Sequence, residues 1–338
     1  MLQYLTKRIF LAIFTTAVIL TVSYVLLRLA PGDPTRSSVI GETGGENLSA
    51  EHGAFRSNEA MRRKLHLDKP IYFGLGHWFI NLAVRGDLGE SVAVDPGRPV
   101  VELIMARLPV TIMLNAWAIL LTYLMAIPIG IYAAVYPDSV FDRLTTVILF
   151  FLYSLPPVWV ALVLQAGLCE GGLFPVFPLK GAVQSAQIGM SSWRIMWNSM
   201  SGFVLPVICL SYGGFAALSR YSRSGMLDVL GQDFIRTARA KGVAEHLVLF
   251  RHALRNAMII LITIFAGLLP GLVAGSIIIE YVFSINGMGT LSLLALNSRD
   301  YPLQMALFSF GSGLTLAGIM ISDLLYVAVD PRINFSSR

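Results

Sequence analysis

The sequence predicts an all-α integral membrane protein with six transmembrane helices and a long loop outside the membrane after the first one. Of its 338 residues, 55% are hydrophobic and only 13% are charged. A soluble domain carries about 25% charged residues. Six apolar segments also approach or exceed the roughly 20 residues that a helix needs to cross the hydrocarbon core. Together these observations exclude a cytosolic enzyme, a disordered chain and a nucleic-acid-binding domain.

The six predicted spans are separated by charged or polar segments. Helix breakers within spans, such as Pro128 and the pair Pro156-Pro157, are tolerated where neighbouring helices satisfy the backbone. We therefore expect a bundle packed around a pathway. The first span is too long for the apolar region of a signal peptide, so we expect an uncleaved helix. The spans are residues 9–27, 109–136, 144–168, 202–219, 256–279 and 303–329.

Basic residues in short loops predict the orientation, because cytoplasmic loops carry an excess of Lys and Arg. Lys7 and Arg8 place the N-terminus inside, and six spans return the C-terminus to the same side. The basic loop 221–255 is then also cytoplasmic. We expect three regions: an N-terminal transmembrane helix (1–30), an extracytoplasmic loop region (31–107) and a five-helix core (108–338). The sequence pI of 9.3 follows from basic residues on the inner face, without a nucleic-acid partner.

Two outer segments have aromatic residues at helical spacing, namely residues 71–91 and 189–200. Because aromatic side chains favour the headgroup level of a bilayer, we expect two helices lying on the outer leaflet. The alternative is a docking platform for an external partner. Residues 41–58 are polar and rich in glycine, which predicts a flexible excursion.

Catalytic and metal-binding signatures are missing from the sequence. No lysine is followed by Ser or Thr, so there is no phosphate loop for ATP hydrolysis. The histidines show no ligand spacing, and two cysteines in apolar surroundings do not form a disulfide scaffold or a cysteine-ligated metal centre. We therefore expect no catalytic residue, metal or cofactor in this chain. Glu280 and Asp323 lie near the ends of their spans and are expected to form helix-packing hydrogen bonds.

The cytoplasmic loop is the most informative stretch. Asp233 is a good candidate N-cap for a helix of about two turns, and Gly242 is a natural residue to follow its end. A second helix is expected from about Ala244 into the fifth span. The first helix could lie on an anionic inner leaflet or insert into a groove of a soluble partner.

Residues 233–242 and 251–257 resemble the EAA loop of ABC importer permeases, and more narrowly the first permease subunit of dipeptide and oligopeptide importers. Ala238, Gly242 and Leu254 match positions of that motif. Four positions depart from it, in ways common in the peptide-permease branch: Arg236, Thr237, His252 and Arg255.

Further stretches carry the same resemblance along nearly the whole chain. Residues 213–218, Asn286 and residues 330–335 look most like the Yej-type branch, which is linked to peptides and peptide-nucleotide antibiotics. The other matching stretches are 30–34, 67–70, 85–91, 107–109, 280–289, 299–302 and 330–333.

This resemblance implies a type I ABC importer permease fold and a five-part importer of the bacterial inner membrane. The partners would be a second homologous permease, ATPase subunits that bind ATP and Mg, a periplasmic binding protein and the lipid bilayer. The resemblance implies that the loop couples to the ATPase through Asp233, Arg236, Thr237, Ala238, Arg239, Ala240, Lys241, Gly242 and Leu254.

The implied function is ATP-driven uptake of di- or oligopeptides, or peptide-like compounds, by alternating access. A peptide needs a polar path, and four polar residues within apolar spans are candidates to line it: Asn115, Ser154, Ser211 and Tyr212. Each could instead bond only to a neighbouring helix. The alternatives are an ion-coupled secondary carrier, an intramembrane enzyme, and the same ABC fold carrying nickel or a siderophore-like compound.

Overall fold

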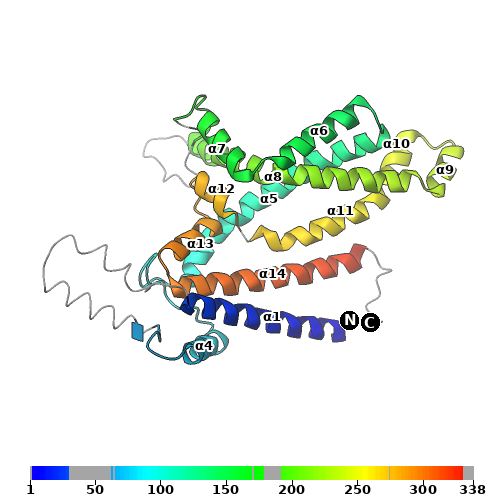
Figure 1. Ribbon diagram of the computed structural model, residues 1–338. Helices are drawn as coiled ribbons and strands as arrows, with labels where there is room; N and C mark the ends of the chain where they lie inside the picture. The colour runs from blue at the N-terminus through cyan, green and yellow to red at the C-terminus, as the bar shows by residue number, and fades with distance from the viewer. Residues whose placement is uncertain are drawn as a thin grey trace. The chain divides into compact units, whose positions relative to one another are not determined.

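The computed structural model describes residues 2–29, 62–63, 65–169, 171–178, 192–273 and 275–329. Within these ranges the chain is helical, and β-structure is limited to two isolated bridges. The chain divides into two compact units (Figure 1). Unit 1 comprises Met1–Pro109 and Thr290–Leu316, and unit 2 comprises Val110–Gly289 and Ala317–Arg338.

Unit 1 combines the first helix with a short outer helix and parts of three other elements. Gly74 of α4 faces α1 so closely that a Cβ atom there would lie 2.1 Å from the Tyr24 hydroxyl oxygen. The elements are α1 (Leu2–Leu29), α4 (Ile71–Ile80) with the π-helical turn η1 (Asn81–Arg85), the start of α5 (Val100–Val135), most of α13 (Met288–Asn297) and the first half of α14 (Tyr301–Val329).

A buried carboxylate connects two distant parts of unit 1. Asp300 precedes α14, and its Oδ1 accepts a hydrogen bond from the Leu303 amide at 3.2 Å. Its Oδ2 accepts from the Ser91 hydroxyl at 2.5 Å. The same oxygen accepts from the backbone amides of residues 92–94 at 3.0 to 3.1 Å. Asp300 therefore holds the loop after Ser91 against the beginning of α14.

Unit 2 is built around α8, which packs against α6, α7 and α11. One of its apolar clusters joins α7 and α8 to α5 and α12 through Leu114, Ala161, Phe203, Ile279 and Phe283. Cys169 and Cys209 are buried in the same cluster and form no disulfide with each other. The principal elements are α6 (Val140–Ser154), α7 (Pro157–Leu168), α8 (Ser192–Leu230), α11 (Leu254–Leu268), the 3-10 turn η3 (Leu269–Leu272) and α12 (Ile277–Val282).

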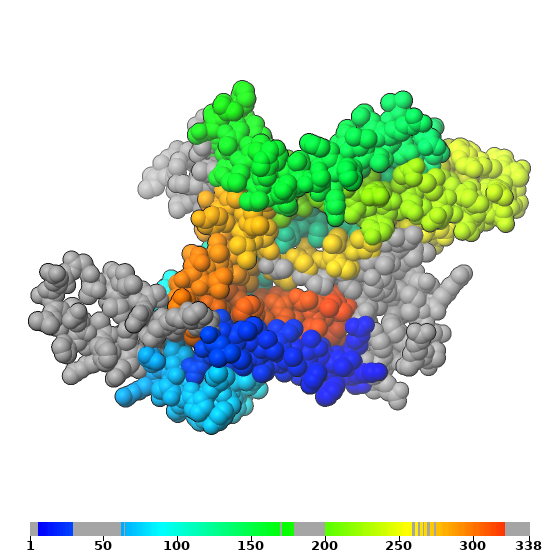
Figure 2. Space-filling view, viewed as in Figure 1, coloured from blue at the N-terminus to red at the C-terminus, as the bar shows by residue number. Residues whose placement is uncertain are grey.

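The predicted spans correspond to helices, but two of them are interrupted. The described residues contain four helices long and apolar enough to cross a membrane, or five if the bent pair α6–α7 is one span. That pair bends by 94° at Leu155-Pro156, because neither Pro156 nor Pro157 has an amide to continue the helix. Figure 2 shows α6 and α7 (green) diverging at the surface of unit 2.

The prediction of one continuous helix over 256–279 is wrong. Helix α11 ends at Leu268, Pro270 lies in the 3-10 turn η3, and Gly275 has a left-handed φ of 68° before α12 begins. The Asn115 amide donates to the carbonyls of Gly271 and Leu272, at 3.3 and 2.9 Å, and so satisfies backbone acceptors released at this break.

Two other boundaries differ from expectation. Residues 192–200 are not a separate outer helix but the first turns of α8, and the loop predicted from residue 221 begins only after Leu230. The outer helix expected within 71–91 is present as α4 and η1. The segments 41–58 and 330–335 lie outside the described residues.

Glu280 forms the helix-packing hydrogen bond expected from the sequence. It is fully buried, and its Oε1 accepts a hydrogen bond from the Thr111 hydroxyl of α5 at 3.1 Å. A Cβ atom on Gly275, Gly287 or Gly289 would lie within 3 Å of this carboxyl group. The glycines of this segment therefore make room for Glu280. The side chain of Asp323 lies outside the described part of α14.

Candidate functional site

The predicted coupling loop forms a compact helical turn at one end of unit 2 (Figure 1). After α8 ends at Leu230, a two-residue turn leads into α9 (Asp233–Ala240). The chain then reverses through α10 (Glu245–Leu247) and the π-helical turn η2 (Val248–Ala253) into α11. Both the short first helix and the second helix from about Ala244 were expected from the sequence.

The start of α9 differs from the prediction by one residue. Gln232 is the N-cap, Asp233 is the first helical residue, and no side chain caps the helix. The Asp233 carboxylate instead lies 3.5 Å from Arg236, and these side chains are 95% and 74% exposed. Because both side chains are exposed, this ion pair contributes little stability. The negative charge of Asp233 in the first turn still interacts favourably with the helix dipole.

The end of α9 is a Schellman motif. Gly242 has a φ of 76°, a left-handed conformation that glycine adopts without strain. The Gly242 amide donates to the Arg239 carbonyl at 2.9 Å, and the Val243 amide donates to the Ala238 carbonyl at 3.3 Å. These are the two bonds that define the motif. The prediction that Gly242 ends this helix is confirmed.

An apolar anchor attaches α9 to the rest of unit 2. Ile235 is fully buried in a cluster with Ala134, Met226 and Val248. Ala238 and Leu254 pack against the same cluster, so these two matched motif positions face their own chain. Ile235 was not predicted from the sequence, although it is the only large aliphatic residue in α9. The exposed residues of α9 and its cap are Asp233, Phe234, Arg236, Thr237, Arg239, Ala240 and Lys241.

An ion pair closes the turn between α9 and α10. Arg239 contacts the Glu245 carboxylate through Nε at 3.1 Å and through Nη2 at 2.6 Å. The hydrogen bond from Arg239 lowers the pKa of Glu245, and the pKa of Arg239 is raised by the same bond. Because the pKa of Glu245 is lower in the folded state, the pair stabilises the turn above the unfolded pKa. This contribution disappears as the pH falls through the folded pKa.

A second ion pair, also missed from the sequence, connects α8 to the start of α6. Arg223 contacts Asp142 through Nε at 2.9 Å and through Nη2 at 2.7 Å, and the Asp142 side chain is only 7% exposed. Asp142 also accepts the Asp138 amide at 3.1 Å. The sequence feature that could have indicated this pair is the presence of opposite charges at the ends of two neighbouring predicted spans.

The four candidate path residues do not form one group. Ser154 is exposed, and its hydroxyl donates to the Phe151 carbonyl of its own helix. Ser211 is fully buried, and its hydroxyl donates to the Val207 carbonyl. The Tyr212 hydroxyl donates to the Leu155 carbonyl at the bend between α6 and α7, at 2.8 Å. Asn115, as described above, bonds the break after α11.

We expect tryptophan at Ser154 and at Ser211 to have different effects. Ser154→Trp adds bulk at an exposed position, so the protein should fold, and if Ser154 lines the path, long peptides should be excluded more than short ones. Ser211→Trp adds the same bulk to a filled site, where overpacking costs about 1–3 kcal/mol or more. Thermal unfolding and peptide uptake distinguish the two. Equal inhibition of all peptide lengths by Ser154→Trp would remove Ser154 from the path.

Several long apolar helices, with a short anchored helix exposed at one end of unit 2, fit the membrane component of a transporter. The chain belongs to the family described as "binding-protein-dependent transport system inner membrane component", which it matches over residues 126–335. It is therefore a multi-pass protein of the inner membrane.

Relatives that match along nearly the whole chain are peptide-type permeases. The chain is 36% identical to "Oligopeptide transport system permease protein AppB" of Bacillus subtilis, covering 99% of this chain and 100% of that protein. It is 33% identical to "Inner membrane ABC transporter permease protein YejB" of Escherichia coli O157:H7 and 30% identical to "Peptidoglycan transport system permease protein YejB" of Agrobacterium fabrum. Each of these two matches covers 99% of both chains.

Proposed function

We propose that this chain is one permease subunit of an ATP-driven ABC importer that takes up peptides or peptide-like compounds. The observation that carries the proposal is full-length similarity to permeases named for oligopeptide transport, combined with an exposed helix where the family places its coupling loop. The chain pairs with a second homologous permease, and the two chains together form the substrate path. A binding protein delivers the substrate outside, and partner subunits bind ATP and Mg.

The proposed coupling surface is the exposed face of α9 together with its cap. It carries Arg236, Arg239 and Lys241 beside Phe234, whose side chain is 43% exposed. Phe234 was not among the coupling residues predicted from sequence. An aromatic side chain surrounded by cations fits a groove that is apolar at its base and acidic at its rim. Ala238 and Leu254 support this surface from beneath.

ATP-driven movement of the coupling surface switches the permease pair between inward-open and outward-open states. Such a switch requires the nucleotide and the binding protein to prefer different states. In the proposed orientation both termini and α9 are cytoplasmic, and the loop between α1 and α5 faces the periplasm.

The function is tested by reconstitution of the four membrane components with the binding protein. We expect uptake of labelled peptides only when ATP and binding protein are both present, and no ATP hydrolysis by this chain alone. A series of peptides of increasing length, with nickel and a siderophore as competitors, identifies the substrate. Uptake that follows an ion gradient without ATP would contradict the proposal, and ATP-driven uptake of nickel alone would correct the substrate.

The orientation is tested with two single cysteines in a chain whose Cys169 and Cys209 are replaced. We expect Asp95→Cys to react with an impermeant thiol reagent from the periplasmic side. Ser224→Cys should react only from the cytoplasmic side. Ser224 is exposed and the Asp95 side chain is 49% exposed, so access to the reagent depends on the side of the membrane. The reverse labelling pattern would invert the topology.

A further inference from the structure

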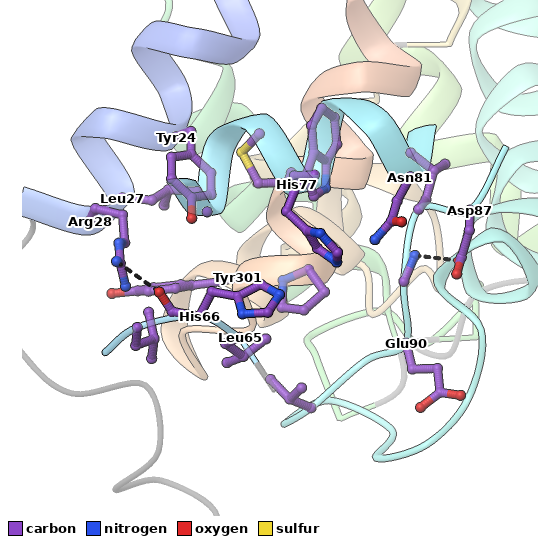
Figure 3. A pocket seen from close by; sticks show the side chains of 18 residues that line it. Tyr24, Leu27, Arg28, Leu65, His66, His77, Asn81, Asp87, Glu90 and Tyr301 are labelled. Atoms are coloured by element: carbon purple, nitrogen blue, oxygen red, sulfur yellow. Dashed lines mark hydrogen bonds between the residues drawn. The ribbon is translucent and has the colours of Figure 1, made fainter. Parts of the chain in front are cut away.

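Unit 1 contains a cavity of about 300 Å³ that is separate from the proposed coupling surface. Its walls come from the last turns of α1, the turn before α4, α4 itself, the segment after η1 and the first turn of α14 (Figure 3). Most of the lining is apolar and includes Leu27, Leu88 and Met305. Polar side chains occupy two opposite sides of it.

The cavity lies at a membrane boundary. The apolar segment 9–27 ends at Arg28, which lines the cavity, and charged side chains mark the level where the hydrocarbon core ends. Large apolar side chains around it are exposed: Leu26 by 63% in α1, Tyr72 by 77% and Ile80 by 60% in α4. Such surfaces are suited to acyl chains and to the headgroup level of a bilayer.

One side of the cavity carries a fixed positive charge. The Nη2 atom of Arg28 donates to the carbonyls of His66 and Lys69, at 3.1 and 2.7 Å. These bonds hold the guanidinium in place, and its Nε and Nη1 groups have no partner among the described residues. The His66 ring stacks edge-on against His77, with centroids 4.5 Å apart. Burial, then the neighbouring His77 and Lys69, lower the pKa of His66, which disfavours its charged form. The lasting positive charge on this side is therefore the guanidinium of Arg28, which is always protonated.

The opposite side carries carboxylates. Figure 3 places Asp87 and Glu90 across the cavity from Arg28. Asp87 Oδ1 accepts the Gly89 amide at 2.8 Å, which fixes its orientation. The cavity thus offers a cation on one side, anions on the other and apolar walls between them.

We propose that this cavity binds the headgroup of a zwitterionic phospholipid of the ethanolamine type. The phosphate lies against Arg28, the ammonium group lies against Asp87, and the acyl chains extend along the exposed surfaces of α1 and α4. In the proposed orientation this lipid belongs to the outer leaflet. Guanidinium–phosphate and ammonium–carboxylate contacts are charge-assisted hydrogen bonds, which are among the stronger polar contacts.

A free peptide is also zwitterionic, but it fits this site less well. Its backbone donors and acceptors would meet mostly apolar walls, where unpaired polar groups lose several kcal/mol of hydration. Between its phosphate and its ammonium group an ethanolamine phospholipid has only two methylene groups, and its ester carbonyls are acceptors with no amide donors beside them.

The experiment uses the assembled transporter in nanodiscs containing equal amounts of phosphatidylethanolamine, phosphatidylcholine and phosphatidylglycerol, followed by native mass spectrometry of retained lipid. We expect the unaltered complex to retain phosphatidylethanolamine preferentially. Asp87→Asn is the decisive variant, because its amide oxygen still accepts the Gly89 amide while the charge is lost. It should reduce the preference for phosphatidylethanolamine over phosphatidylglycerol by about fivefold or more.

Two further variants complete the test. Arg28→Gln should reduce retention of all three lipids, whereas Lys7→Gln, at the other end of α1, should change nothing. An unchanged lipid preference in Asp87→Asn, or equal retention of the three lipids by the unaltered complex, would overturn the proposal. Displacement of the lipid by a dipeptide would assign the cavity to peptide instead. None of these readouts depends on transport, so their failure is distinct from failure of the importer assignment.

Discussion

We expect Gly242→Val to reduce ATP-driven uptake by about tenfold or more while leaving membrane insertion intact. A Cβ atom at this position meets nothing within 4 Å, so the effect comes from the backbone and not from a clash. A β-branched residue held at a φ of 76° costs on the order of 1–2 kcal/mol. The backbone relieves that strain by leaving the left-handed conformation. This breaks the two hydrogen bonds of the Schellman motif and reorients the exposed face of α9.

Two matched variants make this test specific. Gly231→Ala lies in the same loop without a left-handed φ, and its Cβ would make ordinary contacts at 3.6 and 3.8 Å, so uptake should be preserved. Gly242→Asn should recover much of the activity, because asparagine tolerates the left-handed region. The measurements are uptake and co-purification of the ATPase. Normal uptake by Gly242→Val would show that the geometry of this turn is not needed for coupling.

Asp300→Ala is expected to cause the largest loss of stability in unit 1. The substitution removes the acceptor for the Ser91 hydroxyl, for three backbone amides and for the first turn of α14. A buried donor left without an acceptor costs about 1–3 kcal/mol of folding free energy. In this variant several donors lose their acceptor at once. The loop 91–99 should therefore detach, and the outer surface offered to the binding protein should be lost.

Asp95→Ala is the control for this substitution. Asp95 lies in the same loop, but its side chain is 49% exposed and, within the part of the chain that the structure describes, pairs with exposed Arg98 alone. Its removal should change stability by less than about 1 kcal/mol. Thermal unfolding of the purified complex and limited proteolysis within 91–99 measure both effects. If the two variants unfold at the same temperature, Asp300 does not hold this loop.

Membrane class, approximate spans and the position of Gly242 could be predicted because each depends on local sequence. Apolar length predicts a span, and a glycine after a short helix predicts its end. The break at Leu269–Leu272 was not predicted, although Pro270 lies within it, because proline inside a transmembrane helix is compatible with either a kink or an end. Asp233 was misplaced by one residue because Gln232 is a weak capping residue that pattern alone does not favour.

The longest-range contacts could not be assigned to particular residue pairs from the sequence, even where opposite charges lie at the ends of neighbouring spans. Asp300 and Ser91 are 209 residues apart, and Arg223 and Asp142 are 81 apart. Nothing local connects them, because their proximity follows from how helices pack. The same limit applies to Ile235: its burial depends on Met226 and Val248, which meet it only after the chain reverses.

The division of α9 into a buried and an exposed face has a consequence for how such subunits diversify. The side chains of Ile235, Ala238 and Val243 pack in or against the apolar cluster of unit 2. The side chains of Phe234, Arg236 and Lys241 are exposed. Substitutions on the exposed side can therefore accumulate with little effect on folding. A duplicated gene could acquire a different ATPase partner through a few changes there, and a chimera that exchanges only those side chains should retain the stability of its parent.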